Sequence, residues 1–354
     1  MTPGATETLV HEGHRVLIQS GAGEGSGFAD SEYTDAGAQI LRTALDVFSQ
    51  ADLLVKVKEP QPREYDMLRE NQILYTYLHL ASNEQLTRLL IERNITALAY
   101  ETVELANSTL PLLTPMSEVA GRMAIQVAAH YLEKAKGGRG KLLGGVPGVR
   151  PAMVTIIGGG TVGINAAKIA LGMGANVLII DNNPERLRYL DDVLHGNVTT
   201  LSSNRSNISS AVNISDVVIG AVLIPGARAP RLVTQEMVTG MTSGSVIVDV
   251  AVDQGGCIET IKPTSHSNPV YELNGVIHYG VTNMPGAVPR TSTYALTNAT
   301  LPYTICLATR GFEDAVASDP ALAKGVNVYR GQITCSAVAN TFGMKYSPLS
   351  DLLH

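Results

Sequence analysis

The chain has 354 residues, more than one ordinary hydrophobic core accommodates, and this length predicts two domains. Hydrophobic residues make up 45% of the sequence and charged residues 16%, a balance that excludes a disordered chain. A net charge of -6 excludes the broad basic surface typical of proteins that bind nucleic acid or anionic membranes.

The cysteines and the N-terminal residues indicate the cellular compartment in which we expect the protein to work. Cys257, Cys306 and Cys335 are widely spaced and form no CxxC pair, which favours reduced thiols in a cytoplasmic protein. No clustered histidines accompany them, so we expect no metal site. The chain starts without the basic and apolar regions of a signal peptide, and it has no apolar stretch long enough to span a bilayer.

The first hundred residues alternate β-rich runs with amphipathic stretches. The runs are HRVLIQ, DLLVKVK, ILYTYLHL and ITALAY. Between the last two, SNEQLTRLLIERN predicts a helix with Ser82 as its cap and Leu86, Leu89 and Leu90 on one face. This alternation is typical of βαβ units and predicts a parallel sheet.

From Ser117, the alanine-rich stretch SEVAGRMAIQVAAHYLEKAKG predicts a long helix that bridges two domains. A second alternating series follows, from MVTIIG through NVLIID, DVVIGAV and SVIVDVAV to VIHYGVTN, and predicts a doubly wound sheet. The helical stretch TSTYALTNATLPYTICLATRG then returns toward the C-terminus. We therefore predict an α/β protein with two Rossmann-like domains: a discontinuous one at 1–112 and 290–354, and one at 113–289.

The sequence GGGTVG at 158–163 follows a predicted strand and opens a helix. Gly158 permits a tight turn, Gly160 lets the backbone approach a pyrophosphate, and Gly163 lets helix and strand pack closely. Asp181 ends the next strand at about the twenty-residue offset expected of a ribose-binding acid. Its carboxylate favours NAD over NADP, whereas the nearby Arg186 argues in the other direction. A glycine turn used only for packing is the weaker alternative.

An earlier glycine-rich sequence, GAGEGSG at 21–27, also follows a predicted strand. Its third glycine is misplaced for a dinucleotide motif. The residues that follow, Phe28-Ala29-Asp30, open no stretch with the apolar period of a helix. We interpret this segment as a tight loop rather than as a phosphate site.

Polar residues at the carboxyl ends of parallel strands are the first candidates for chemistry. Lys58, His79 and Asp253 each follow a β-rich run. A lysine can hold a carboxylate or carbonyl, a histidine can transfer protons near neutral pH, and an aspartate can act as a base. Each also has a plainer interpretation: a solvated lysine with Lys56 competing for its role, a structural histidine, and a turn-capping aspartate.

Taken together, these motifs resemble the alanine dehydrogenase family. The resemblance runs along nearly the whole chain and is carried by GHRVLIQSGAGEGSGFAD, LLVKVKEP, LYTYLHLA, PMSEVAGRMA, GGVPGV, IGGGTVG, IGAVLIPGARAP, VDVAVDQGGC, GVTNMPGAVPRTSTYALTNAT and LAKGVNVYRG. The family is also similar to the dinucleotide-binding part of proton-translocating transhydrogenase, but PMSEVAGR and VDVAVDQGGC match the dehydrogenase versions.

The resemblance implies NAD-dependent, reversible oxidative deamination of L-alanine to pyruvate and ammonium. It also implies a homo-oligomer, specifically a hexamer. It implies His79 and Asp253 as catalytic residues, without deciding which is the base. The implied substrate contacts are Lys58, Tyr77, Met116 and Asn283. The implied cofactor contacts are Ser117, Gly158, Gly160, Val162, Gly163, Asp181, Arg186, Ser203, Val222, Leu223, Asn283 and Met284.

One departure from the family concerns the start of the chain. Family members carry, before the pair that is Thr2-Pro3 here, a first strand and turn whose arginine binds the substrate carboxylate. Neither is present in this sequence. Either the true start lies upstream, or this version has an exposed sheet edge in the substrate domain and an impaired carboxylate site. Two alternatives to the dehydrogenase stay open: a transhydrogenase-type dinucleotide-binding subunit, and an inactive structural subunit.

Overall fold

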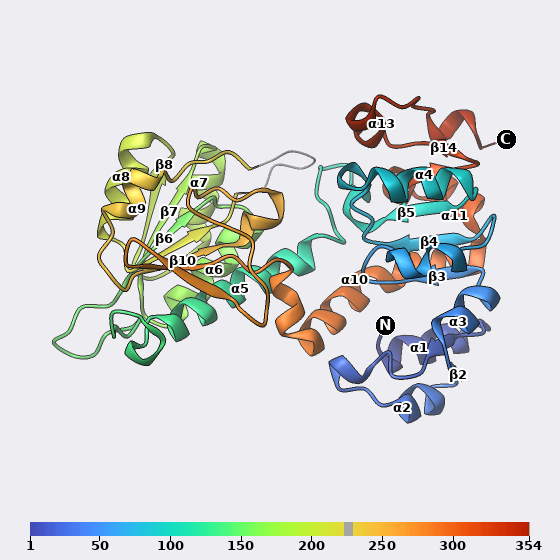
Figure 1. The fold of residues 1–354 in the computed structure, drawn as a ribbon, viewed down its shortest axis with the longest axis horizontal. Helices are drawn as coiled ribbons and strands as arrows, with labels where there is room; N and C mark the ends of the chain where they lie inside the picture. The colour runs from blue at the N-terminus through green and yellow to red at the C-terminus, as the bar shows by residue number, and fades with distance from the viewer. Residues whose placement is uncertain (223–228, 354) are drawn as a thin grey trace. The chain divides into compact units, whose positions relative to one another are not determined.

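The structure is a computed structural model that describes residues 1–222 and 229–353. The chain forms two compact units (Figure 1): unit 1 consists of Met1–Met116 and Pro289–His354, and unit 2 of Ser117–Val288. The divisions between the units lie after Met116 and Val288. Unit 1 is therefore discontinuous in sequence and unit 2 is continuous.

Unit 2 is built on a seven-stranded sheet in the order β11-β12-β10-β9-β6-β7-β8. The strands are β6 (Met153–Ile157), β7 (Asn176–Asp181), β8 (Val198–Ser202), β9 (Val217–Gly220), β10 (Val246–Asp249), β11 (Val270–Leu273) and β12 (Val276–Tyr279). All neighbours pair in parallel except β11, which lies antiparallel to β12. The chain runs outward from β6 to β8 and returns through β9, so the sheet is doubly wound and its direction switches between β6 and β9.

Helices cover the buried strands of this sheet. They are α5 (Thr114–Tyr131), α6 (Thr161–Gly172), α7 (Pro184–Val193), α8 (Arg205–Ile214) and α9 (Gln235–Thr239). On one face, Val218 and Ile247 pack with Val212 of α8 and Val238 of α9 in one cluster of buried side chains. Side chains buried on both faces explain the nearly continuous apolar runs of the sequence. The predicted bridging helix is shorter than expected, because it ends at Tyr131 and a separate turn, η5 (Lys134–Lys136), follows.

Unit 1 holds a five-stranded sheet in the order β14-β13-β5-β4-β3 and a separate parallel pair, β1-β2. The strands are β1 (Leu17–Gln19), β2 (Gln39–Leu41), β3 (Leu53–Val55), β4 (Ile73–Thr76), β5 (Thr96–Ala99), β13 (Val326–Tyr329) and β14 (Gln332–Ile333). β3, β4 and β5 are parallel, whereas β13 and β14 are antiparallel additions. Within the described chain, β3 pairs only with β4 and is an edge strand.

The helices of unit 1 come from both halves of its sequence. They are α1 (Pro3–His11), α2 (Asp30–Asp35), α3 (Ala44–Gln50), α4 (Glu84–Glu92), α10 (Pro289–Arg310), α11 (Phe312–Ser318), α12 (Pro320–Lys324) and α13 (Ser336–Phe342). The cap predicted for α4 was wrong by one residue: the Asn83 side chain accepts the Leu86 N–H, while the Ser82 hydroxyl donates to the His79 carbonyl. Asparagine and serine are both good caps, so composition alone does not choose between them.

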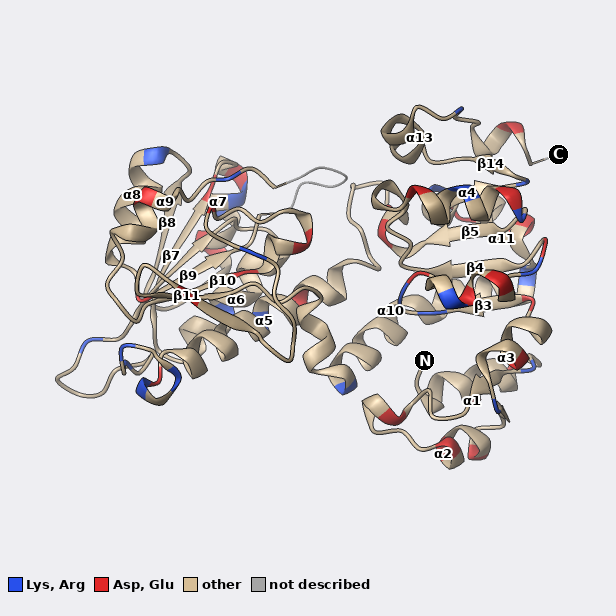
Figure 2. Cartoon of the chain, in the orientation of Figure 1, with Lys and Arg blue, Asp and Glu red and all other residues tan. Residues whose placement is uncertain are grey.

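Charged residues of both signs are interspersed over the elements of each unit (Figure 2). No helix in the described parts of the chain combines the length and the apolar character needed to cross a membrane. Searched over the same residues, the structure holds no group of His, Cys, Asp and Glu suited to a metal ion.

Candidate active site

The glycine turn after β6 is as tight as its sequence predicts. Gly158 has φ +101°, and a Cβ atom built there would lie 2.6 Å from the Ala221 carbonyl oxygen. At Gly163 a Cβ would lie 2.0 Å from the Gly158 carbonyl oxygen. Both contacts are shorter than any side chain tolerates, so glycine is required at both positions. Gly160 differs, because nothing lies within 4 Å of its Cβ position and its backbone faces open space.

Helix α6 starts directly after this turn, and its first turn contains Val162 and Gly163. Gly160 is the N-cap and contributes no side-chain cap. The first N–H groups of α6 therefore carry the partial positive charge of the helix terminus, which suits a phosphate group. The open space at Gly160 and these N–H groups fit the pyrophosphate of a dinucleotide.

Asp181 and Arg186 both hold the peptide backbone of Gly159. The Asp181 Oδ2 atom accepts the Gly159 N–H at 2.7 Å, and the Arg186 Nε donates to the Gly159 carbonyl at 2.5 Å. Arg186 also lies over the Tyr189 ring, with 4.8 Å from guanidinium carbon to ring centroid. The Arg186 guanidinium thus braces the turn, and the free lone pairs of the Asp181 carboxylate can still accept ribose hydroxyls.

Further predicted cofactor contacts are Ser203, Val222, Ser117 and Leu223. Ser203 follows β8 and donates its backbone N–H to the Asp181 carbonyl at 2.9 Å. Val222 follows β9 beside the switch point and packs against the core, half-buried. Ser117 lies in the first half of α5 and is half-buried. Leu223 lies outside the described residues.

Elsewhere in unit 2, the polar residues Asp253 and Asn283 contact each other. Asp253 lies in the 3-10 helix η6 (Val250–Gln254) after β10, and both its carboxylate oxygens lie 3.3 Å from the Asn283 backbone nitrogen. Asn283 has φ +54° and caps the 3-10 helix η7 (Met284–Ala287), whose Met284 is buried. The His266 Nε2 lies 3.2 Å from the Asn283 carbonyl oxygen. Asp253 and Asn283 are both exposed.

In unit 1 the corresponding polar residue is His79. It lies beyond the end of β4 with φ +49° and has an exposed side chain. Its backbone N–H donates to the Glu101 Oε1 at 2.6 Å, and its ring stacks on the Tyr77 ring with centroids 6.0 Å apart. The Tyr77 hydroxyl donates to the Leu112 carbonyl at 2.6 Å, and burial raises the pKa of Tyr77 above its ordinary value. Tyr77 therefore supports the His79 ring as well as being a predicted substrate contact.

The two competing lysines differ in their surroundings. Both lie just beyond β3, which ends at Val55 and is shorter than the run DLLVKVK suggested. The Lys56 amine is 2.8 Å from the Glu64 Oε1, and its side chain is only 22% exposed. Lys58 is exposed. An ammonium that is already paired is a poor ligand for a substrate carboxylate, so the geometry favours Lys58. Met116, in the first turn of α5, is half-buried against the core of unit 1.

Sequence inspection missed two residues that hold the predicted ones. Glu101 follows β5 in the neighbouring 3-10 helix η4 (Tyr100–Thr102), and its position after the run ITALAY was an available signal. His266 lies in a loop between η6 and β11, where no pattern marks it. Both contact backbone groups of predicted site residues. The spacing of residues along the sequence does not reveal such contacts.

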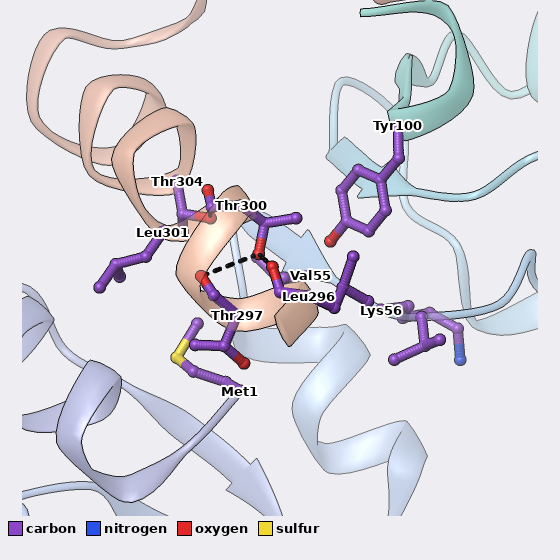
Figure 3. Close-up of a pocket in the computed structure, with 10 residues that line it drawn as sticks. Met1, Val55, Lys56, Tyr100, Leu296, Thr297, Thr300, Leu301 and Thr304 are labelled. Atoms are coloured by element: carbon purple, nitrogen blue, oxygen red, sulfur yellow. Dashed lines mark hydrogen bonds between the residues drawn. The ribbon is translucent and has the colours of Figure 1, made fainter. Parts of the chain in front are cut away.

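A small cavity in unit 1 lies apart from the predicted residues. It has a volume of about 160 Å³ and lies between the end of β3 and α10. In Figure 3 the Tyr100 ring and three threonines of α10 surround it, and the Thr300 hydroxyl donates back to the Leu296 carbonyl at 2.9 Å. The Thr304 hydroxyl likewise donates to the Thr300 carbonyl at 2.9 Å, so both hydroxyls bond within their own helix. Lys56, the lysine paired with Glu64, also lines this cavity.

Comparisons with known proteins place the chain in a family. The family model "Alanine dehydrogenase/PNT, N-terminal domain" matches residues 1–120, and "Alanine dehydrogenase/PNT, C-terminal domain" matches 124–336. The chain belongs to the alanine dehydrogenase/PNT family.

Similar sequences and structures extend over nearly the whole chain. It is 58% identical over 355 residues to "Alanine dehydrogenase" of Methanococcus maripaludis, covering 100% of this chain and 95% of the relative. With "Alanine dehydrogenase" of Geobacillus stearothermophilus it shares 55% identity over 356 residues, with the same coverage. A solved "L-alanine dehydrogenase" matches with TM-score 0.94 at 54% identity, covering 97% of this chain and 94% of that one. A transhydrogenase structure from Sinorhizobium meliloti matches with TM-score 0.79 at 25% identity, covering 95% and 94%.

Proposed function

We propose that this member of the family is an NAD-dependent L-alanine dehydrogenase, which converts L-alanine, NAD and water to pyruvate, ammonium, NADH and a proton, and also runs in reverse. The observation that carries the proposal is the presence of the exposed polar residues Lys58, His79 and Asp253 beyond strand ends in a chain at least 54% identical to proteins of that name. The transhydrogenase match, at 25%, supports the alternative less.

In the proposed cofactor site, the N-terminus of α6 binds the pyrophosphate and Asp181 accepts from the adenosine ribose. When bound, NAD would accept a hydride from the substrate. A 2′-phosphate would meet the negative charge of Asp181, which supports NAD over NADP. Arg186 donates to the carbonyls of Gly159 and Gly160 at 2.5 and 3.4 Å, so its guanidinium is directed toward the turn.

In the proposed substrate reaction, Lys58 binds the carboxylate of alanine or pyruvate. Loss of hydride from the alanine α-carbon leaves an imine, to which water adds before ammonium departs. His79 and Asp253 take and return the protons of these steps. Glu101 fixes the backbone of His79, and the Asn283 N–H donates to the Asp253 carboxylate.

The assignment is tested by mixing the protein with NADH, pyruvate and ammonium and following NADH absorbance. We expect NADH consumption that requires both pyruvate and ammonium. Asp253→Asn should bind NADH normally and lose about 100-fold or more in kcat, the scale of general acid-base catalysis. The control is Asp192→Asn, an exposed carboxylate on α7, which should change neither quantity. NADH binding with no consumption in the unmodified protein would refute the alanine assignment, and hydride exchange with a second nucleotide would favour the transhydrogenase alternative.

We also propose, on the resemblance alone, that the chain assembles as a homohexamer and works in the cytoplasm. Sedimentation or light scattering of the purified protein tests the assembly. A monomer that still turns over alanine would remove the hexamer from the proposal.

A further inference from the structure

One buried carboxylate in unit 2 has no part in the mechanism above. Asp249 ends β10, and its side chain is fully buried at 0% exposure. The groups that donate to it are the backbone N–H groups of Ala251, Cys257 and Ile258, together with the Cys257 thiol. Burying a carboxylate in the core costs free energy unless hydrogen bonds or an opposite charge compensate it.

The bonds of Asp249 connect the two ends of one short segment. Its Oδ1 accepts the Ala251 N–H at 2.9 Å and so caps the 3-10 helix η6. Its Oδ2 accepts the N–H groups of Cys257 at 2.9 Å and Ile258 at 3.1 Å. The chain between these anchors leaves the core and returns, and Asp253 lies in the middle of it.

The neighbouring backbone is shaped around this carboxylate. A Cβ atom at Gly220, the last residue of β9, would lie 2.6 Å from the Asp249 Oδ1. At Gly256 a Cβ would lie 2.9 Å from the Oδ2. Both positions hold glycine, so the Asp249 carboxylate is packed closely between the end of β9 and the loop that follows η6.

We infer that Asp249 is a positioning residue for the reaction: by tying Ala251 to Cys257 and Ile258 it holds η6 so that the Asp253 carboxylate meets the Asn283 N–H. The inference rests on the proposed function, because it concerns the orientation of the proposed catalytic Asp253. Burial raises the pKa of Asp249 to about 6, with the three backbone N–H bonds and the thiol acting in the opposite direction, as expected for a buried carboxylate held by dipoles.

The test compares Asp249→Asn with Asp216→Asn. Asp216 is the matched control because it too is a buried carboxylate of unit 2, but it lies at the start of β9 and is bonded to Arg139 and Lys141 at 2.6 Å each. Asparagine at 249 presents an N–H group toward backbone N–H donors, so one anchor of the segment is lost. We expect kcat to fall at least tenfold in Asp249→Asn while the NADH dissociation constant stays within about threefold. Asp216→Asn should lose stability but keep kcat within about twofold.

Hydrogen-deuterium exchange provides a readout that does not depend on turnover. Peptides covering 250–258 should exchange faster in Asp249→Asn and not in Asp216→Asn. If Asp249→Asn does not fold, Gly220→Ala is the second variant, since its methyl group displaces the carboxylate without removing the charge. Unaltered kcat and exchange in either folded Asp249 or Gly220 variant, beside an inactive Asp253→Asn, would overturn the positioning role alone. A wild type that turns over no alanine or pyruvate would overturn the proposed function and this inference together.

Discussion

The Oε1 atom of Glu101 lies 2.6 Å from the backbone nitrogen of His79 and 4.0 Å from the Nδ1 of its ring. One carboxylate thus holds His79 in a left-handed backbone conformation and carries a negative charge close to its imidazole. The Glu101 side chain is 18% exposed, so water screens this charge only in part. The same carboxylate also accepts the Leu78 N–H at 3.1 Å.

Replacement of Glu101 by glutamine should therefore impair the proposed chemistry at His79. The amide keeps the size but loses the charge and one acceptor, and a lost hydrogen bond to a charged group corresponds to about tenfold or more in kcat. NADH affinity should be unchanged. The control is Glu104→Gln, which affects an exposed carboxylate paired with Lys324 at 2.8 Å. Steady-state kinetics with a fluorescence titration of NADH measure both quantities, and equal kcat in the two variants would separate Glu101 from the reaction.

The elements of the dinucleotide turn could be predicted because their signal is local. Gly158, Gly163 and Asp181 belong to one βαβ unit, whose register is set by strand pairing between neighbours. The contact between His79 and Glu101 depends instead on the register of β4 against β5, and that between Asp253 and Asn283 on loops after two separate strands. Spacing along the sequence identifies such residues one at a time and does not pair them.

Strand ends were the least predictable feature. The runs DLLVKVK and SVIVDVAV continue past the structural strands, which end at Val55 and Asp249. Apolar alternation persists in the 3-10 helix η6 because Ala251 and Val252 remain buried there. The Asp249 carboxylate stops β10 by capping that helix, and a side chain that bonds its own backbone two residues later leaves no mark in a hydrophobic pattern.

The glycine turn offers a test of cofactor binding within one helix. Gly163→Ala would place a methyl group 2.0 Å from the Gly158 carbonyl oxygen, so the turn must shift. Such a shift costs about 1–3 kcal/mol, and we expect NADH affinity to fall at least tenfold. In Gly172→Ala, at the end of the same helix, nothing lies within 4 Å of the new methyl group. That control should bind NADH normally; if Gly163→Ala does so as well, α6 does not bind the pyrophosphate.

The two lysines after β3 can be separated by matched substitutions. Lys58→Gln should raise KM for pyruvate by about tenfold or more, because the exposed ammonium proposed to bind the carboxylate is removed. Lys56→Gln should leave KM unchanged and lower stability by about 1 kcal/mol, since it breaks the partly buried pair with Glu64. Pyruvate kinetics and urea unfolding of both variants test this. The reverse pattern, with KM raised only in Lys56→Gln, would transfer the substrate role to Lys56.

The buried Asp249 predicts how stability depends on pH. Burial raises its pKa to about 6, against 3.8 for a free aspartate, so the folded protein binds this proton more tightly than the unfolded chain does. The resulting contribution to stability is fully present below about pH 4 and is lost as pH rises through about pH 6. Its size is about 3 kcal/mol.

Asparagine at position 249 does not titrate, so Asp249→Asn should lack this contribution. The free energy of unfolding of the wild type minus that of the variant should therefore decrease by up to about 3 kcal/mol between about pH 4 and about pH 7. Urea unfolding at a series of pH values measures the difference, with Asp192→Asn as an exposed control. A difference that stays constant over this range, or that grows as pH rises, would mean that the Asp249 carboxylate is ionised in the folded protein at least as readily as in water, because its hydrogen bonds fully offset its burial.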